Sequence, residues 1–336
     1  MQIQQNKSLE AFNTFGIDVQ AAAFSSFSDT NELEELVSEY ANTRLLIIGG
    51  GSNLLLTSNF SGLVLKNNIK GIEKIREDNE FVFVKAGAGE NWHQFVLHCI
   101  EHGWAGVENL SLIPGSIGAS PMQNIGAYGV EIKDVFYELE AFHLKEKTLV
   151  KFTLDDCAFG YRESVFKKQY KDQFVIVSVT FQLRKQPQFN TSYGAIAEEL
   201  QKMGITTLSI KAISDAVIRI RSSKLPNPKE IGNAGSFFKN PEVSLAHFNS
   251  LKEKYPAIVG YPLHNNQVKL AAGWLIEQCG WKGYRKGDAG CHSKQALVLV
   301  NYGHATGKEI YDLSTEILNS VNEKFGVLLE REVNII

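Results

Sequence analysis

Cysteines and long apolar runs are scarce in this sequence. Its 336 residues include only Cys99, Cys157, Cys279 and Cys291, and no two of these are spaced as CxxC. Four isolated cysteines do not make a disulfide framework, so we expect free thiols in a reducing compartment. The polar N-terminus lacks the apolar core of a signal peptide. No apolar run approaches the ~20 residues that span a bilayer. These absences predict a cytoplasmic globular protein with no membrane partner.

A charge excess and a metal signature are also missing. The 34 Lys and Arg against 37 Asp and Glu give a net charge of −3, which argues against nucleic acid as a partner. His98 and His102 lie one helical turn apart, but no third ligand and no HExxH pattern accompanies them, so no metal site is predicted. The apolar content of 44% is ample for several cores. The length suggests about two or three domains at ~100–200 residues each.

The apolar patterning alternates between helix and strand, which predicts an α+β fold. Leu45–Ile48 is a short buried strand, and residues 175–183 alternate with period two, as in a half-buried strand. A helix is expected from about Ser209, and residues 310–321 mark a long amphipathic helix. The last strand-like piece is residues 327–336.

A glycine-rich turn, Gly49-Gly50-Gly51-Ser52-Asn53, follows the first buried strand. Glycines there can bring consecutive N–H groups close to a phosphate, although for this stretch by itself an ordinary glycine-rich turn is the better interpretation. It matches neither GxGxxG nor GK[ST], and no helical pattern follows it. A phosphate bound here would therefore be held by backbone amides and Ser52 without a helix dipole.

A second small-residue stretch covers residues 110–129, with polar Gln123 and Asn124 inside it. It suits a flat aromatic ligand lying against backbone, or else it is a long surface loop. Loops of this length in compact domains usually serve a function. Two such stretches in one chain favour an extended cofactor with a diphosphate link over either stretch alone.

Ser236 and Arg162 are the first candidates for chemistry. Ser236 lies between a glycine-rich turn and two phenylalanines, where it could donate a proton or simply cap the turn. No GxSxG motif occurs, which argues against a hydrolase serine. The planar fork of Arg162 suits a carboxylate or phosphate, and the alternative is an ion pair with Glu163 or Asp156.

Charged residues near the end of the predicted helix and near the C-terminus add further candidates. Arg221 and Lys224 precede a proline-rich break and could meet a second phosphate, although basic residues favour helix C-termini in any case. Glu330 and Glu332 would share one face of a strand. One of them could act as an acid or base, while two solvated glutamates on an edge strand are the alternative.

Ten motifs, taken in order, resemble one family. They are Phe12–Phe15, Gly49–Leu55, Ile113–Gly118, Gln123–Gly129, Tyr161–Ser164, Lys224–Pro226, Gly235–Pro241, Ala272–Glu277, His292–Val298 and Leu329–Val333. In this order and over nearly the whole chain, the sequence resembles the UDP-N-acetylenolpyruvoylglucosamine reductases. The segments around Tyr193 and Tyr261 resemble the longer subtype, which carries a substrate-covering segment with a mobile tyrosine.

The resemblance implies a three-domain flavoprotein with a vanillyl-alcohol-oxidase-type FAD-binding fold. The expected division is residues 1–70 and 71–215 for FAD and 216–336 for the UDP-sugar, with a C-terminal strand able to return to the FAD domains. NADPH would reduce FAD and leave. The reduced flavin would then pass hydride to UDP-N-acetylglucosamine-enolpyruvate, giving UDP-N-acetylmuramate for peptidoglycan. We also expect a monomer, with NADPH and the sugar using one pocket.

The resemblance also implies roles for individual residues. Arg162 and Glu332 would bind and polarise the substrate carboxylate, with Glu332 kept protonated by a raised pKa, and Ser236 would deliver the proton. The positions implied for FAD are Gly49, Gly50, Gly51, Ser52, Asn53, Leu54, Pro114, Gly115, Ser116, Gly118, Ala119, Gln123, Asn124, Gly126, Ala127, Tyr128 and Gly129. Those implied for the UDP-sugar are Tyr193, Arg221, Lys224, Asn240, Tyr261 and Gln295.

One departure and two alternatives accompany this resemblance. Asn334 stands where the family often has arginine, which puts a tail contact to the cofactor in question. Glu332 is preferred to Glu330 because it directly precedes Val333, as in the family pattern. The alternatives are another FAD-dependent oxidoreductase acting on a sugar or alcohol, and a nucleotide-sugar-binding protein without activity.

Overall fold

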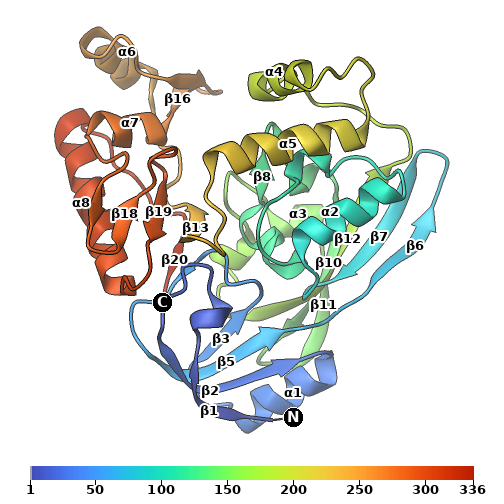
Figure 1. Cartoon of the computed structure of the whole chain (residues 1–336). Helices are drawn as coiled ribbons and strands as arrows, with labels where there is room; N and C mark the ends of the chain where they lie inside the picture. The colour runs from blue at the N-terminus through green and yellow to red at the C-terminus, as the bar shows by residue number, and fades with distance from the viewer. Residues whose placement is uncertain (1) are drawn as a thin grey trace. The chain divides into compact units, whose positions relative to one another are not determined.

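The computed structural model describes residues 2–336, which form two compact units. Unit 1 comprises the chain up to Lys7, Ala21–Gly50 and Ser61–Ser223. Unit 2 comprises Ser8–Gln20, Gly51–Phe60 and Lys224–Ile336. Figure 1 follows the chain by colour from its N-terminus to its C-terminus. Mixed helices and strands confirm the predicted α+β class.

The first sheet of unit 1 has the order β1-β2-β5-β3. Its strands are β1 (Gln4–Ser8), β2 (Gln20–Phe27), β3 (Leu45–Ile48) and β5 (Phe60–Asn67), and β3 pairs in parallel with β5. Helix α1 (Thr30–Glu39) begins at Asp29, whose side chain accepts a hydrogen bond from the Glu32 amide. The buried face of α1 carries Leu33 and Leu36, which belong to the same apolar core as Leu63.

The second sheet of unit 1 is antiparallel, in the order β11-β10-β12-β7-β6. Its strands are β6 (Ile72–Glu77), β7 (Phe81–Gly87), β10 (Phe136–His143), β11 (Thr148–Thr153) and β12 (Phe174–Arg184). The sequence predicts a half-buried β12, yet the strand is buried on both faces. The reason is that Val175 and Val177 join the core of the first sheet. Val179 and Phe181 join a second core with Trp92 of α2 (Trp92–Glu101).

Two further helices of unit 1 pack against each other. Helix α5 (Ile210–Lys224) matches the helix expected from about Ser209 and ends before the proline-rich break. Helix α4 (Gly194–Lys202) lacks a counterpart among the predicted elements. The two pack through Ile196 and Leu200 of α4 against Ile213 and Val217 of α5 (Figure 1).

Unit 2 contains an antiparallel sheet with the order β13-β19-β18-β17. Its strands are β13 (Gly232–Ser236), β17 (Arg285–Lys286), β18 (Ala289–Cys291) and β19 (Val298–Asn301). The predicted amphipathic helix is α8 (Gly307–Phe325), which begins with a capping box between Thr306 and Glu309.

A second, smaller sheet in unit 2 has the order β14-β16-β15, and two helices accompany it in the chain. The elements are β14 (Glu242–Ser244), α6 (Leu245–Lys254), β15 (Gly260–Pro262), β16 (Gln267–Leu270) and α7 (Ala272–Gln278). The turn of the chain from β16 into α7 places the N-terminus of α7 next to Leu270, whose amide bonds the carbonyl oxygen of Pro241.

The C-terminal strand is shorter than the predicted residues 327–336. Only β20 (Asn334–Ile335) is a strand, and it pairs in parallel with β4 (Leu54–Leu55). The segment changes partner along its length, because Arg331 bridges to Phe238 before the chain reaches β4. Arg331 also fixes the segment to α8, since its Nε donates to Ser314 Oγ at 2.8 Å.

The four cysteines are free, and Cys99, Cys157 and Cys291 are buried. Burial raises the pKa of the Cys157 and Cys291 thiols to about 12. Across residues 2–336, no helix combines the length and the apolar character needed to cross a membrane. The two sheets of unit 1 are compatible with a two-part flavin region, and the boundaries near residues 70 and 215 stay predictions.

Candidate functional site

The two glycine-rich stretches meet backbone to backbone in unit 1. A Cβ atom on Gly50 would stand 2.9 Å from the Cα of Gly115, and one on Gly49 would overlap Ser116 Oγ. Side chains at these positions would therefore push the stretches apart. The structure brings together the two segments that the sequence assigns to one cofactor, although they are about 65 residues apart in the chain.

The second stretch is held in place by the segment that joins β7 to α2. The amides of Ile117 and Gly118 donate to the carbonyl oxygens of Glu90 and Ala88, each at 2.8 Å. A Cβ on Gly118 would lie 2.6 Å from that of Ala88, so the close approach requires glycine. This stretch is thus a rigid platform and not a loose surface loop.

Asn124 is a fully buried residue of this platform with φ +43°. Its Nδ2 donates to Glu131 Oε2 and to the carbonyl oxygen of Gly160, both at 3.0 Å, and its Oδ1 accepts from the Lys133 amide. The amide group of Asn124 therefore has its hydrogen-bond partners within the protein. A contact from this position to FAD would come from its main chain.

Arg162 lies two residues after Gly160 in the chain and contacts the same platform. Its Nη2 donates to the carbonyl oxygen of Gly126 at 2.7 Å, and its guanidinium lies 5.4 Å from the centre of the Tyr161 ring. Its φ of +55° is in the left-handed region that side chains rarely adopt. Strained backbone of this kind concentrates at functional sites.

Tyr128, Arg221 and Tyr193 form a cluster at the other end of the platform. Arg221 is half-buried and donates from Nε to the carbonyl oxygen of Leu112 at 3.2 Å, and it also hydrogen bonds the Tyr128 phenol. Burial lowers the pKa of Arg221 and raises that of Tyr128. The rings of Tyr128 and Tyr193 meet edge to face at 5.4 Å. One predicted cofactor residue and two predicted substrate residues thus lie together.

Ser236 and Glu332 are neighbours in unit 2. Ser236 pairs with Val298 across the sheet, and the Glu332 amide donates to the carbonyl oxygen of Phe237 at 2.8 Å. Glu330 instead pairs its carboxylate with Lys239 Nζ at 2.6 Å. This ion pair holds the Glu330 carboxylate, and the choice of Glu332 as the functional glutamate stays a prediction.

Asn240 and Gln295 lie at the N-terminus of α7, close to the Ser236 stretch. Asn240 Oδ1 accepts from the Ala272 amide at 3.0 Å, and the Phe237 amide donates to the carbonyl oxygen of Leu297 at 2.7 Å. Gln295 Oε1 accepts from the Leu297 amide at 3.3 Å. Four predicted site residues therefore gather around the short segment 236–240.

The remaining predicted residues are placed individually. Lys224 is the last residue of α5, and Tyr261 on β15 is 52% exposed. Asn334 donates from its backbone amide and from Nδ2 to the carbonyl oxygen of Asn53, at 3.1 and 3.0 Å. The asparagine that replaces the family's arginine thus holds the tail onto a predicted cofactor segment.

Sequence reasoning missed three residues that hold these groups in place. Arg331 fixes the tail that carries Glu332, Lys239 pairs with Glu330, and Asn109 contacts two predicted site segments. Their partners lie between 16 and 91 residues away in the chain, and no local spacing identifies them.

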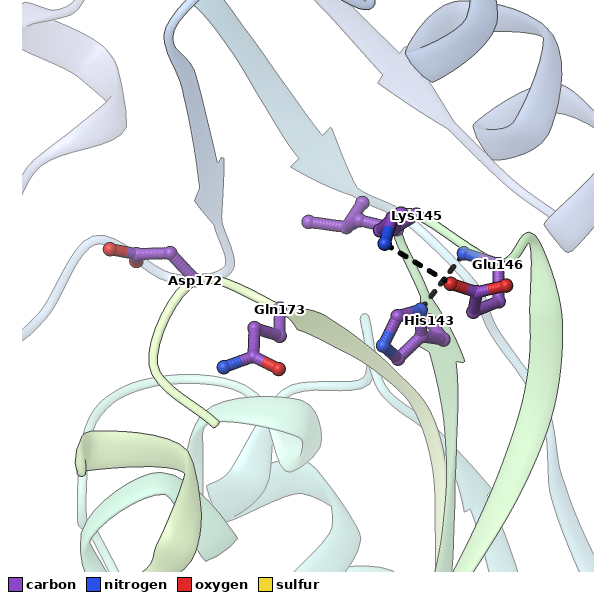
Figure 2. A pocket seen from close by; sticks show the side chains of 6 residues that line it. His143, Lys145, Glu146, Asp172 and Gln173 are labelled. Atoms are coloured by element: carbon purple, nitrogen blue, oxygen red, sulfur yellow. Dashed lines mark hydrogen bonds and ion pairs between the residues drawn. The ribbon is translucent and has the colours of Figure 1, made fainter. Parts of the chain in front are cut away.

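A pocket of about 360 Å³ lies elsewhere in unit 1 (Figure 2). It is lined by His143, Leu144, Lys145, Glu146, Asp172 and Gln173, none of which is a predicted site residue. Its polar groups partly pair with one another, as His143 Nδ1 accepts from the Glu146 amide at 2.9 Å and Lys145 lies 3.7 Å from the Glu146 carboxylate. The pocket does not extend the site.

Comparison with known families identifies the class first. Residues 21–151 match the family described as FAD binding domain, so the glycine-rich platform belongs to a flavin-binding protein. Residues 227–336, which carry Ser236 and Glu332, match the C-terminal domain of UDP-N-acetylenolpyruvoylglucosamine reductase.

Full-length relatives define the family. The chain is 54% identical to UDP-N-acetylenolpyruvoylglucosamine reductase of Amoebophilus asiaticus and 50% identical to that of Flavobacterium johnsoniae, with 100% of both chains covered in each case. The chain belongs to the UDP-N-acetylenolpyruvoylglucosamine reductase family. A crystal structure of the Thermus caldophilus reductase shares the fold, with a TM-score of 0.68 at 23% identity over 100% of this chain and 99% of that one.

Proposed function

We propose that this protein uses NADPH and FAD to reduce UDP-N-acetylglucosamine-enolpyruvate to UDP-N-acetylmuramate, a peptidoglycan precursor. The observation that carries the proposal is that the Glu332 amide bonds the carbonyl oxygen of Phe237, the residue after Ser236, within a chain that matches its relatives from end to end. A serine hydroxyl at the end of β13 and a carboxyl group on the neighbouring C-terminal segment suit the protonation of an anionic product precursor.

The structure fits FAD at the glycine-rich platform. Gly49 and Gly50 lie against Ser116 and Gly115 without intervening side chains, so the main chain of both stretches can approach a ligand closely. When bound there and reduced by NADPH, FAD would supply a hydride for the terminal methylene carbon of the enolpyruvyl ether. The platform residues hold the cofactor, and Arg162 is fixed to the same platform through Gly126.

Side chains of the protein stabilise the negative charge that develops on the substrate and donate the proton. Hydride addition builds negative charge on the carbon that bears the carboxylate and the ether oxygen. The Arg162 guanidinium and the Glu332 carboxyl group stabilise this charge as it spreads into the substrate carboxylate. The Ser236 hydroxyl then donates its proton to that carbon, which completes the lactyl ether. A neighbouring group or water must return a proton to Ser236.

Binding of the UDP-sugar is assigned to Tyr193, Arg221, Lys224, Asn240, Tyr261 and Gln295. The exposed fractions of Tyr193 and Tyr261, 49% and 52%, suit residues that cover a substrate after it binds. This supports the longer subtype, in which such a tyrosine is mobile. We further propose that the protein acts in the cytoplasm as a monomer, and that it binds no nucleic acid.

Anaerobic reoxidation of the flavin tests the function directly. Enzyme reduced by NADPH or dithionite should be reoxidised by the enolpyruvyl UDP-sugar in the absence of oxygen, with UDP-N-acetylmuramate as product. Reoxidation by oxygen alone would indicate another flavin-dependent oxidoreductase. A colourless protein that FAD cannot reconstitute would indicate a binding protein.

NADPH and the UDP-sugar should inhibit each other competitively if they share a pocket. Independent binding of the two would refute the shared pocket.

Substitution of Gly50 tests the FAD platform. The Cβ of a Gly50→Val variant would press on the backbone of Gly115, so we expect the two stretches to separate and the purified protein to lose most of its bound flavin. Flavin absorbance per mole of protein is the measurement. Gly204→Val is a matched control, because no atom lies within 4 Å of its added Cβ, although its φ of +69° costs some stability. Full flavin content in the Gly50 variant would refute the platform.

A further inference from the structure

Asn109 is a buried amide that holds two segments of the candidate site at once. Its Nδ2 donates to the carbonyl oxygen of Tyr128 at 3.1 Å and to that of Asn190 at 2.9 Å. The side chain is 2% exposed, so water does not compete for these two bonds. The two N–H groups of this side-chain amide thus bond two residues that are 62 positions apart in the chain.

The second segment is joined to the first by an asparagine of its own. Asn190 Nδ2 donates to the carbonyl oxygen of Gly129 at 3.0 Å, and its Oδ1 accepts from Ser192 Oγ at 2.8 Å. The chain from Asn190 to Ser192 is therefore set against residues 128 and 129. It leads directly into Tyr193 and then into α4.

These bonds determine where two side chains lie. The ring centroids of Tyr193 and Tyr128 lie 5.4 Å apart, and the Tyr128 phenol hydrogen bonds the half-buried Arg221. Tyr128 has φ +51°, a strained conformation that the surrounding contacts must maintain. Asn109 bonds the carbonyl oxygen of this strained residue, so it supports the Arg221 contact as well as the approach of Tyr193.

We infer that Asn109 is a positioning residue for substrate binding, which fixes Tyr193 and the Tyr128–Arg221 pair in the arrangement that receives the UDP-sugar. The inference rests on the proposed function, because it assigns Tyr193 and Arg221 to that substrate. Asn109 does not touch the substrate, and it acts through Tyr128 and Asn190.

The test is Asn109→Asp, which keeps the shape of the side chain but replaces the donor with an acceptor facing two carbonyl oxygens. We expect KM for the UDP-sugar to rise about tenfold or more, while the rate of flavin reduction at saturating NADPH changes less than twofold. Chymotrypsin should cut after Tyr193 faster than in the wild type. Asn190→Ala removes the side-chain bonds from Asn190 to Gly129 and Ser192 but keeps those of Asn109. It should give a smaller rise in KM and in the cutting rate. This variant tests the inference if Asn109→Asp does not fold.

Asn67→Asp is the matched control. Asn67 is another buried amide of unit 1, which donates to the carbonyl oxygen of Ile176 at 3.0 Å in the sheet region. Its replacement should lower thermal stability without raising KM or the rate of cutting after Tyr193. An unchanged KM in both Asn109→Asp and Asn190→Ala, or an equal rise in the control, would overturn the inference. Wild-type protein that fails the anaerobic reoxidation assay would instead overturn the proposed function.

Discussion

Ser236→Ala should leave the reduction of FAD by NADPH intact and slow the reduction of the enolpyruvyl sugar by ~10²–10⁴-fold, as expected for the loss of a positioned general acid. The variant removes one oxygen atom from a half-buried position on β13, where the backbone pairing with Val298 stays available. Substrate can still bind and polarise, but the carbon that becomes negatively charged lacks its proton donor. Stopped-flow measurement of the two half-reactions separates these effects.

Ser244→Ala is the control for this variant. Ser244 belongs to the same unit and caps α6 by accepting from the His247 amide at 3.2 Å. Its loss should cost about 1 kcal/mol of stability without changing either half-reaction. If the second half-reaction of Ser236→Ala matches that of the control, Ser236 has no part in proton transfer.

Arg162→Lys should lower the rate of sugar reduction by ~10²–10³-fold, the range for loss of one group that stabilises transition-state charge. Lysine keeps the positive charge but cannot offer two parallel N–H groups to a carboxylate. It also loses the bond from Nη2 to the carbonyl oxygen of Gly126, which fixes the direction of the side chain. Both losses act on the substrate carboxylate, so product formation under saturating substrate is the measurement.

Arg184→Lys offers the matched comparison. Arg184 ends β12 in the same unit, and its guanidinium lies 5.0 Å from the centre of the Phe81 ring. Since neither the sequence nor the structure places it at the site, its replacement should leave the rate within twofold of the wild type. A comparable loss in both variants would mean that the effect of Arg162→Lys is a general loss of stability.

Elements specified by local pattern could be predicted from the sequence. Helix α8 has its apolar stripe, β3 is a short apolar run followed by glycines, and α5 ends at a proline-rich break. The resemblance supplied Ser236 and Glu332, and the structure places them beside each other. These helices and strands depend on a few residues that are close together in the sequence, and the two site residues belong to motifs that occur in a fixed order.

Features that depend on distant partners could not be predicted. The burial of β12 on both faces arises because these faces belong to two different cores, which no alternation pattern reveals. The tail splits its pairing between Phe238 and β4, so a continuous apolar run does not become one long strand. The role of Asn109 depends on its bonds to residues 128 and 190, which only the folded chain brings within reach of its side chain.

The low reactivity expected of the four native thiols makes the protein suitable for labelling with thiol-specific probes. Burial raises the pKa of all four thiols, so they remain protonated and slow to alkylate at neutral pH. A cysteine introduced at the exposed Ser192 would therefore react with a maleimide dye well ahead of the native ones. A fluorophore at that site would report the motion of the segment before Tyr193 in an otherwise natural chain, with no need for a cysteine-free background.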